Sequence, residues 1–290
     1  MSPVVCCKYH HKWQGGSCRT RYRKHRFVVY LLFFQAEQWF TSFLLRVNPP
    51  GGIGTFNDTK IPIKMGYGDG SYGAEGTIGV APFRFGTYEV LKQAFVYVTN
   101  STIGALDELG VYGLFGLSFD LASSSRVKAA VQRRYGNSAT WGNSVLYNIF
   151  DQNPSQPNVI AMRLSRTDDL EDTKGGSFTI GEYDPDYADD VTKSPKLAQY
   201  PEGGSRWTTL LEDICIDGKS IPLKSMIRGV PAGRVQPMLD TGVPTASFPA
   251  PLWDAIYSSI PGAVKYNKEL WLVPCNSTTI VELEFGYAFY

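Results

Sequence analysis

From residue 51 onward, hydrophobic and polar residues alternate in short runs, which is typical of half-buried β-strands. The clearest run, 59–86, alternates around the glycine-rich stretch YGDGS and predicts a β-hairpin. A strand is predicted directly after it, over 91–100. The same character predicts further strands within 158–166, 176–184, 206–223 and 279–286.

Three segments space their apolar residues as a helix does: 126–136, 144–152 and 250–262. The apolar run 111–120 is broken by two glycines, which predicts close backbone packing there. The acidic stretch 166–176 is typical of a solvated loop. Many short strands with a few helices predict a mostly β, two-lobed protein.

Composition places the chain among globular proteins, because 43% of its residues are hydrophobic and 19% are charged. The net charge of +1 hides an asymmetry. Residues 1–50 hold eight of the 28 Lys and Arg but one of the 27 acids, which leaves a net charge of −6 on residues 51–290.

The positions of the histidines and cysteines limit the kinds of catalytic or metal site that residues 51–290, the body of the chain, can form. All three histidines lie before residue 26, so residues 51–290 cannot supply the base of a Ser-His-Asp or Cys-His site. The body's two cysteines, Cys215 and Cys275, lie far apart and without paired spacing, which argues against zinc. If the body is an enzyme, carboxyl groups must act as its general acid and general base.

The basic head, residues 1–50, is atypical and is not expected to belong to the fold. Its stretch RTRYRKHR followed by FVVYLLFF imitates a targeting signal, but the apolar run is too short to span a membrane and no small-residue cleavage site follows. Three interpretations stay open: a degenerate targeting segment or anchor, a basic patch for nucleic acid, and a misassigned start of the reading frame. We expect no nucleic-acid partner and no membrane span.

Asp240-Thr241-Gly242 is the motif with most chemical content. It reads either as an ordinary Asx-type turn or as half of a carboxylate pair that activates water. The second reading requires another aspartate.

Three motifs occur in the order of the pepsin-like aspartic proteases. YGDGS at 67–71 resembles the flap of that family, and GLFGL at 113–117 resembles the hydrophobic-hydrophobic-glycine segment of its N-terminal lobe. LDTG at 239–242 resembles the catalytic motif of the C-terminal lobe, and WLVPCN at 271–276 resembles the strand with the C-lobe half-cystine. The resemblance, to secreted fungal-type members, covers residues 53–290 and implies a bilobal, mostly β fold.

The resemblance implies hydrolysis of peptide bonds at acid pH. In this family two aspartates share one proton: the ionised one polarises a water for attack, and the protonated one donates to the developing oxyanion. No metal or organic cofactor is needed. The substrate is an extended peptide or protein, covered by the flap, and a monomer is expected.

Matched residue by residue, Asp240 is the catalytic carboxylate of the C-lobe, with Thr241 bracing its loop and Gly242 allowing close backbone approach. Tyr67, Gly68 and Asp69 match the substrate-binding residues of the flap. An ordinary hairpin turn remains the alternative for the flap residues, since Gly-Asp-Gly is a turn sequence in any context.

The sequence departs from the family in three ways. The N-lobe Asp-Thr-Gly is missing; Asp58-Thr59-Lys60 lacks the glycine and abuts the flap. Val243 replaces the usual Thr or Ser, whose hydroxyl supports the catalytic carboxylate. The partner of Cys275 in the family lies beyond the equivalent of Tyr290, so we expect a free thiol at Cys275.

These matches predict an N-lobe remnant with the flap at 51–160 and a C-lobe, truncated at its end, at 161–290. Three functions follow as alternatives: an aspartic endopeptidase by family whose present chain is inactive, a non-catalytic peptide-binding relative, and an enzyme assembled from two chains. Three Asn-x-Ser/Thr sequons, at Asn57, Asn100 and Asn276, favour extracellular or vacuolar placement.

Overall fold

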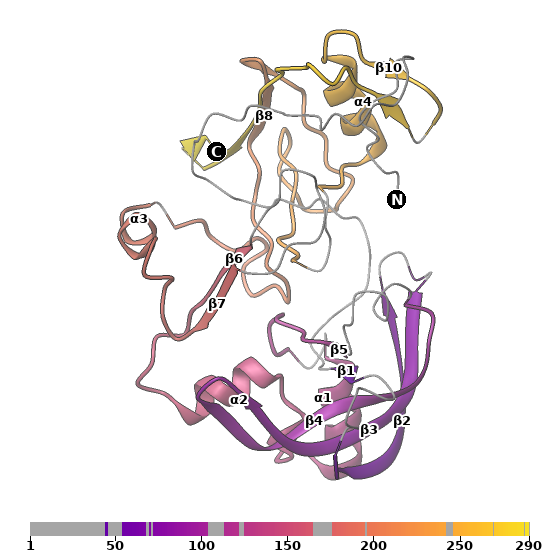
Figure 1. The fold of residues 1–290 in the computed structure, drawn as a ribbon, viewed down its shortest axis with the longest axis vertical. Coiled ribbons are helices and arrows are strands. Elements are labelled where there is room, and N and C mark those ends of the chain that lie inside the picture. Colours follow the sequence, from indigo (N-terminus) through magenta and orange to yellow (C-terminus); the bar gives the residue numbers. More distant parts are fainter. Residues whose placement is uncertain are drawn as a thin grey trace, which may run out of the picture. The chain divides into compact units, whose positions relative to one another are not determined.

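The computed structural model describes two compact units (Figure 1). The first unit contains the described residues between 44 and 158 together with 205–207, and the second those of 159–204 and 208–289. The described residues are 44–45, 54–67, 70, 72–103, 113–121, 125–164, 176–194, 196–241, 246–268, 270–286 and 288–289.

The first unit is built on a five-stranded sheet with the order β2-β3-β4-β1-β5. Its long members are β2 (Asn57–Tyr67), β3 (Tyr72–Phe85) and β4 (Tyr88–Ser101), joined as antiparallel neighbours. The predicted hairpin over 59–86 and the strand over 91–100 are therefore confirmed. β1 (Leu44–Leu45) and β5 (Gly113–Leu114) complete the sheet.

Alternation along β2 decides which face of this sheet is buried. Ile63, Met65 and Tyr67, two residues apart, are all buried, whereas Lys64 between them is exposed. They pack with residues of β3 and β4 and with a helix behind the sheet. The main core of the first unit therefore lies on this face of the sheet, and the opposite face is also covered in part, since Gln93 and Phe95 of β4 are buried.

Two helices and a 3₁₀ turn follow the sheet: α1 (Arg126–Tyr135), η1 (Thr140–Gly142) and α2 (Val145–Gln152). Both predicted helices are confirmed. Ser125 caps α1 by accepting the amide of Lys128, and Ser144 caps α2 by accepting the amide of Tyr147. Val127 and Val131, one turn apart, point from α1 into the core.

The second unit consists of short strands and two helices. Its strands are β6 (Ile160–Leu164), β7 (Gly176–Ile180), β8 (Asp213–Ile216), β9 (Lys219–Ser220), β10 (Val264–Lys265), β11 (Trp271–Leu272), β12 (Val281–Phe285) and β13 (Ala288–Phe289). Its helices are α3 (Ala188–Lys193) and α4 (Ala250–Ser258). Each strand-bearing segment and the last helix expected from the sequence are found.

A four-stranded sheet, β13-β12-β8-β9, supports the core of this unit. Ile214 of β8 and Phe285 of β12 are almost fully buried and pack with Leu252 and Ile256 of α4. Burial of such a side chain contributes roughly 1.5–3 kcal/mol each. Helix α4 is therefore fastened to the sheet by its apolar side, as the helical spacing of 250–262 predicts.

One part of the basic head belongs to the fold, which corrects the expectation for those residues. Leu44–Leu45 forms β1, parallel to β4 and antiparallel to β5. β1 lies between β4 and β5 and pairs with the backbone of both strands, a pairing that composition does not reveal. The other residues of 1–50 lie outside the described residues. The predicted loop 166–176 also lies outside them, except for Gly176, which begins β7.

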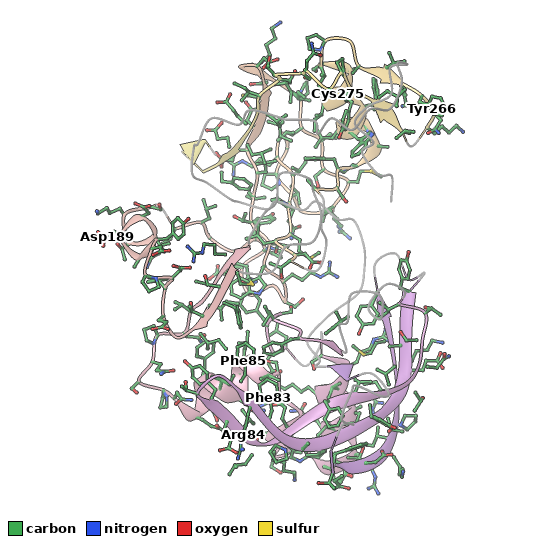
Figure 2. The ribbon with its side chains drawn as sticks, in the orientation of Figure 1. Phe83, Arg84, Phe85, Asp189, Tyr266 and Cys275 are labelled. Atoms are coloured by element: carbon green, nitrogen blue, oxygen red, sulfur yellow. The ribbon has the colours of Figure 1, made fainter. Side chains whose placement is uncertain are left out.

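The expectation of a free thiol at Cys275 is wrong. Cys275, labelled in Figure 2 and exposed after β11, is disulfide-bonded, and its partner lies outside the described residues. Cys215 is buried in β8 and free, so no Cys215–Cys275 bond exists. The expectation rested on the family's partner lying beyond the equivalent of Tyr290.

Candidate active site

Asp240 lies at the end of a short backbone ladder in the second unit. Leu211 and Val235 exchange two hydrogen bonds, of 2.9 and 3.2 Å, and Thr208 pairs with Met238 further along. The amide of Thr209 donates to the carbonyl of Pro237 at 3.3 Å. Asp240 follows two residues after the last pair and is half-buried, so the ladder fixes the backbone that leads to it.

A polar network supports this ladder from one side. Thr208, itself buried, donates from Oγ1 to the carbonyl of Tyr200 at 2.6 Å, and the amide of Tyr200 donates back at 2.9 Å. Gln236 donates from Nε2 to the same carbonyl at 2.9 Å. Sequence reasoning did not find these residues, because Thr208 and Gln236 are polar residues within short strand-like runs and resemble solvent-facing positions.

The rest of the motif is only partly described. Thr241 is exposed and begins a turn, whereas Gly242 and the following Val243 lie outside the described residues. The supporting roles of Thr241 and Gly242 therefore stay predictions.

The flap residues lie where β2 turns into β3, in the first unit. Tyr67 and Tyr72 form the last pair of the hairpin, and the amide of Gly70 donates to the carbonyl of Tyr67 at 3.0 Å. Gly70 has a φ of 91°, which suits glycine. Gly68 and Asp69 lie outside the described residues. The hairpin expected at YGDGS is thus present, and its tip is a tight turn.

Tyr67 is buried, with 5% of its surface exposed. It continues the core face of β2, two residues beyond Met65, so alternation turns its ring inward. Burial raises the pKa of its phenol, which keeps the hydroxyl protonated at any pH where an acid protease works. A substrate-binding role for Tyr67 stays a prediction, and it requires the phenol to be reached from this inner face.

The base of the hairpin is tied to the strand beside it. The amide of Gly73 donates to Oγ1 of Thr102 at 2.8 Å, and the amide of Thr102 donates to the carbonyl of Gly73 at 2.9 Å. Ser101 donates to the same carbonyl at 3.3 Å. This anchor lies directly after the last pair of the flap and fixes the base of the hairpin.

The GLFGL segment is held in the first unit by residues distant in sequence. Trp207 donates from Nε1 to the carbonyl of Leu117 at 2.8 Å, and its ring lies 4.4 Å from that of Phe119. Phe115 contacts Phe83 and Phe85 of β3, each with ring centroids 5.7 Å apart, and both are labelled in Figure 2. The short stretch 205–207 thus crosses into the first unit, which no sequence signal indicates.

A buried ion pair fixes the end of the same segment. The carboxylate of Asp120, with 3% of its side chain exposed, pairs with Lys128 of α1. Its other oxygen accepts the amide of Ser144, the cap of α2, at 2.7 Å. Asp120 therefore joins the GLFGL segment to the starts of two helices.

Three carboxyl groups among the described residues have lowered pKa values. A hydrogen bond from Lys60 lowers the pKa of Asp58, one from Ser177 lowers that of Asp184, and bonds from Lys265 and Trp271 lower that of Asp254. These groups stay ionised further into the acid range than free carboxyls do.

The described residues contain neither a metal-binding cluster nor a membrane-spanning helix. No group of three or more His, Cys, Asp or Glu there could hold a metal ion. No helix among them has the length and apolar character to cross a membrane.

Comparisons with known proteins agree with the motifs. The family described as eukaryotic aspartyl protease matches residues 50–288. A probable aspartic-type endopeptidase of Arthroderma otae is 27% identical over 144 residues, which cover 49% of this chain and 34% of the relative. Another, of Aspergillus fumigatus, is 26% identical over 196 residues, which cover 63% of this chain and 41% of the relative.

The family match spans most of the chain, so this protein belongs to the eukaryotic aspartyl proteases, a family of pepsin-like hydrolases. The mostly β fold expected from the sequence is confirmed. The matched part spans about a third to two-fifths of the length of the curated relatives.

Proposed function

We propose that this chain carries the C-lobe half of an aspartic endopeptidase site, with Asp240 as its catalytic carboxylate. The single observation that carries the proposal is the position of Asp240 in an Asp-Thr-Gly motif, half-buried, two residues after the backbone pairs of Val235–Met238. That arrangement holds a carboxyl group rigidly enough to share a proton with a second carboxyl group and leaves it open to water.

The reaction is hydrolysis of a peptide bond by an activated water. One carboxylate takes a proton from the water while its partner, still protonated, donates to the carbonyl oxygen of the substrate. Neither step passes through a covalent enzyme intermediate. Asp240 can fill one of the two roles, and a second aspartate must fill the other.

The flap residues Tyr67, Gly68 and Asp69 are the proposed contacts to an extended peptide. The anchor between Gly73 and Thr102 supports this role, because it fixes the base of the hairpin that carries these residues. Thr241 and Gly242 are the proposed support of the catalytic loop. The proposed organisation is an N-lobe from 51 to 160 and a C-lobe from 161 to 290, acting as a monomer.

The test uses this chain completed with an N-lobe segment that carries its own Asp-Thr-Gly. Cleavage of a denatured protein is measured at pH 3–5, with and without a statine-containing inhibitor. We expect inhibitor-sensitive cleavage that Asp240→Asn reduces by about 10⁴-fold or more. Asp151→Asn, an exposed carboxyl group on α2, is the matched control and should leave the rate unchanged. Full activity of Asp240→Asn would refute the assignment.

A second candidate is a relative that binds peptides without cutting them. It is favoured by the one Asp-Thr-Gly motif in the 290 residues and by Val243, which lacks the hydroxyl that supports the carboxylate in the family. Binding of the statine-containing inhibitor by the unmodified chain, without turnover of any substrate, would distinguish this candidate.

The proposed placement is extracellular or vacuolar. It is supported by the family and by the three sequons. Secretion of the natural protein into an acidic compartment, detected by antibody, tests this placement.

A further inference from the structure

All three sequons lie within the described residues, and their asparagines share one property. Asn57, Asn100 and Asn276 are solvent-exposed. An N-linked glycan is bulky and hydrophilic, so the nitrogen that carries it must face water in the folded protein. Exposure is therefore compatible with a glycan at each position.

The hydroxyl groups of the sequons differ sharply. Transfer of a glycan to Asn-x-Ser/Thr requires the hydroxyl at the third position as well as the amide nitrogen. Thr59 donates from Oγ1 to the carbonyl of Ile78 at 2.6 Å, and Oγ1 of Thr102 accepts the amide of Gly73 at 2.8 Å. Folding thus occupies the hydroxyls of the first two sequons with bonds across the sheet.

The backbone around the asparagine also differs between the first two sequons and the third. Asn57 lies in β2 opposite Val80, and Asn100 lies in β4 opposite Glu75. A transferase that must bind the chain around either asparagine meets a strand already paired with β3. These two sequons can be bound only while the sheet is unformed.

Asn276 lies in a turn between β11 and β12. The turn is closed by a hydrogen bond from the amide of Ser277 to the carbonyl of Pro274, at 2.9 Å. Thr278 is exposed, and its hydroxyl has no hydrogen-bond partner in the part of the chain that the structure describes. The amide and the hydroxyl of this sequon are therefore both reachable from solvent.

We propose that Asn276 is a site of N-linked glycosylation and that its sequon, unlike those of Asn57 and Asn100, remains an acceptor after folding. In this reaction Nδ2 of Asn276 attacks the anomeric carbon of an oligosaccharide held on a polyprenyl pyrophosphate. The new C–N bond forms as the bond from carbon to the pyrophosphate oxygen breaks, and a transferase base takes the amide proton. The reaction involves no oxidation, and it rests on the proposed secretory placement.

The test compares the folded chain with its own tryptic peptides. Unglycosylated full-length protein is incubated with a eukaryotic oligosaccharyltransferase and a lipid-linked oligosaccharide, then reduced, alkylated and digested. The tryptic peptides 47–60, 93–126 and 269–290 each contain one sequon, so mass spectrometry assigns the glycan. We expect the folded chain to be modified in 269–290 at least tenfold more than in the other two, and the free peptides to be modified in all three.

Two variants sharpen the result. Thr278→Ala should abolish the glycan at Asn276, and Thr278→Ser should retain it; both substitute an exposed residue, so the fold is unaffected. An unmodified Asn276 in the folded chain overturns the proposal, as does equal modification of Asn57 and Asn100 there. The readout needs no peptidase activity. If Asn276 is modified while Asp240→Asn in the completed chain keeps full activity, the proposed catalysis fails and this site stands.

Discussion

Gly76 allows β3 and β4 to approach each other at an irregularity in their pairing. A β-carbon on Gly76 would lie 1.8 Å from the carbonyl oxygen of Tyr97, a distance that no side chain tolerates. The pairing register shifts between Glu75 and Gly76, next to the hairpin that leads to the flap. A single residue without a side chain therefore sets the path of the flap hairpin.

Gly76→Ala should lower the free energy of unfolding by about 3 kcal/mol, the upper part of the range for overpacking, because backbone rather than a flexible side chain must move. Thr87→Ala, in the exposed turn after β3, is the control and should change stability by less than about 0.5 kcal/mol. Urea unfolding followed by tryptophan fluorescence measures both. Wild-type stability in Gly76→Ala would show that β3 and β4 separate without cost.

The Asp120–Lys128 pair acts at the scale of elements, because it connects the GLFGL segment to α1 and, through Ser144, to α2. Both side chains are largely removed from water, with 3% and 14% exposed. Removal of one member of a buried pair leaves the other charge without compensation.

Asp120→Ala should therefore destabilise the protein by about 3–5 kcal/mol. Asp189→Ala is the contrasting case: its pair with Lys193 joins two side chains that are 93% and 77% exposed, and its loss should cost less than about 0.5 kcal/mol. Thermal unfolding of the two variants measures the difference. Equal effects would mean that solvent reaches Asp120.

Asp254 connects α4 to the β10–β11 hairpin. Its carboxylate accepts hydrogen bonds from Lys265 and from the indole of Trp271, and these bonds lower its pKa. A carboxyl group with a lowered pKa in the folded state stabilises the fold above its unfolded pKa of about 3.9, and loses this contribution as the pH falls through the folded value.

Asp254→Asn should consequently be less stable than wild type near pH 6, and the difference should shrink as the pH falls below about 3.9. The measurement is the urea midpoint of both proteins from pH 6 to pH 2.5. Asp151→Asn, which removes an exposed carboxyl group of α2, serves as control. A constant difference over the whole range would show that the side chain acts by packing and not by charge.

At the scale of the whole molecule, periodic patterns of hydrophobic residues predicted the strands and helices, which depend on local sequence. Alternation in β2 predicted the hairpin, whereas the burial of Tyr67 at its end was not predicted and comes from the structure. Contacts between distant segments carry no such signal. The bond from Trp207 to Leu117 and the bond from the amide of Ser144 to Asp120 depend on how the chain returns on itself, which composition and spacing do not encode.

The residues of the candidate site also fall into those that the sequence predicts and those that it does not. Asp240 was found because Asp-Thr-Gly is a contiguous motif, whereas Thr208, Tyr200 and Gln236, which support its ladder, are scattered over some forty positions and joined by backbone atoms. The disulfide at Cys275 was missed because cysteine pairing depends on proximity in space.

The 290 residues contain one Asp-Thr-Gly where the mechanism of the family uses two. One carboxyl group can accept a proton from water or donate one to the carbonyl oxygen, but it cannot do both in a single step. Catalytic groups that act as a unit lose most of their effect when one is removed, commonly by about 10⁴–10⁶-fold. We therefore expect the 290-residue chain to show little or no cleavage of a denatured protein at pH 3–5.

The control is the same chain completed with a second Asp-Thr-Gly segment, assayed at equal concentration. Strong, inhibitor-sensitive cleavage by the unmodified chain would contradict the prediction in one of two ways. If specific activity rises with protein concentration and a mixture with Asp240→Asn chains is inhibited, two chains each contribute one Asp240. If specific activity is constant with concentration, a second carboxyl group within one chain completes the pair, and replacing the remaining aspartates and glutamates one at a time would identify it.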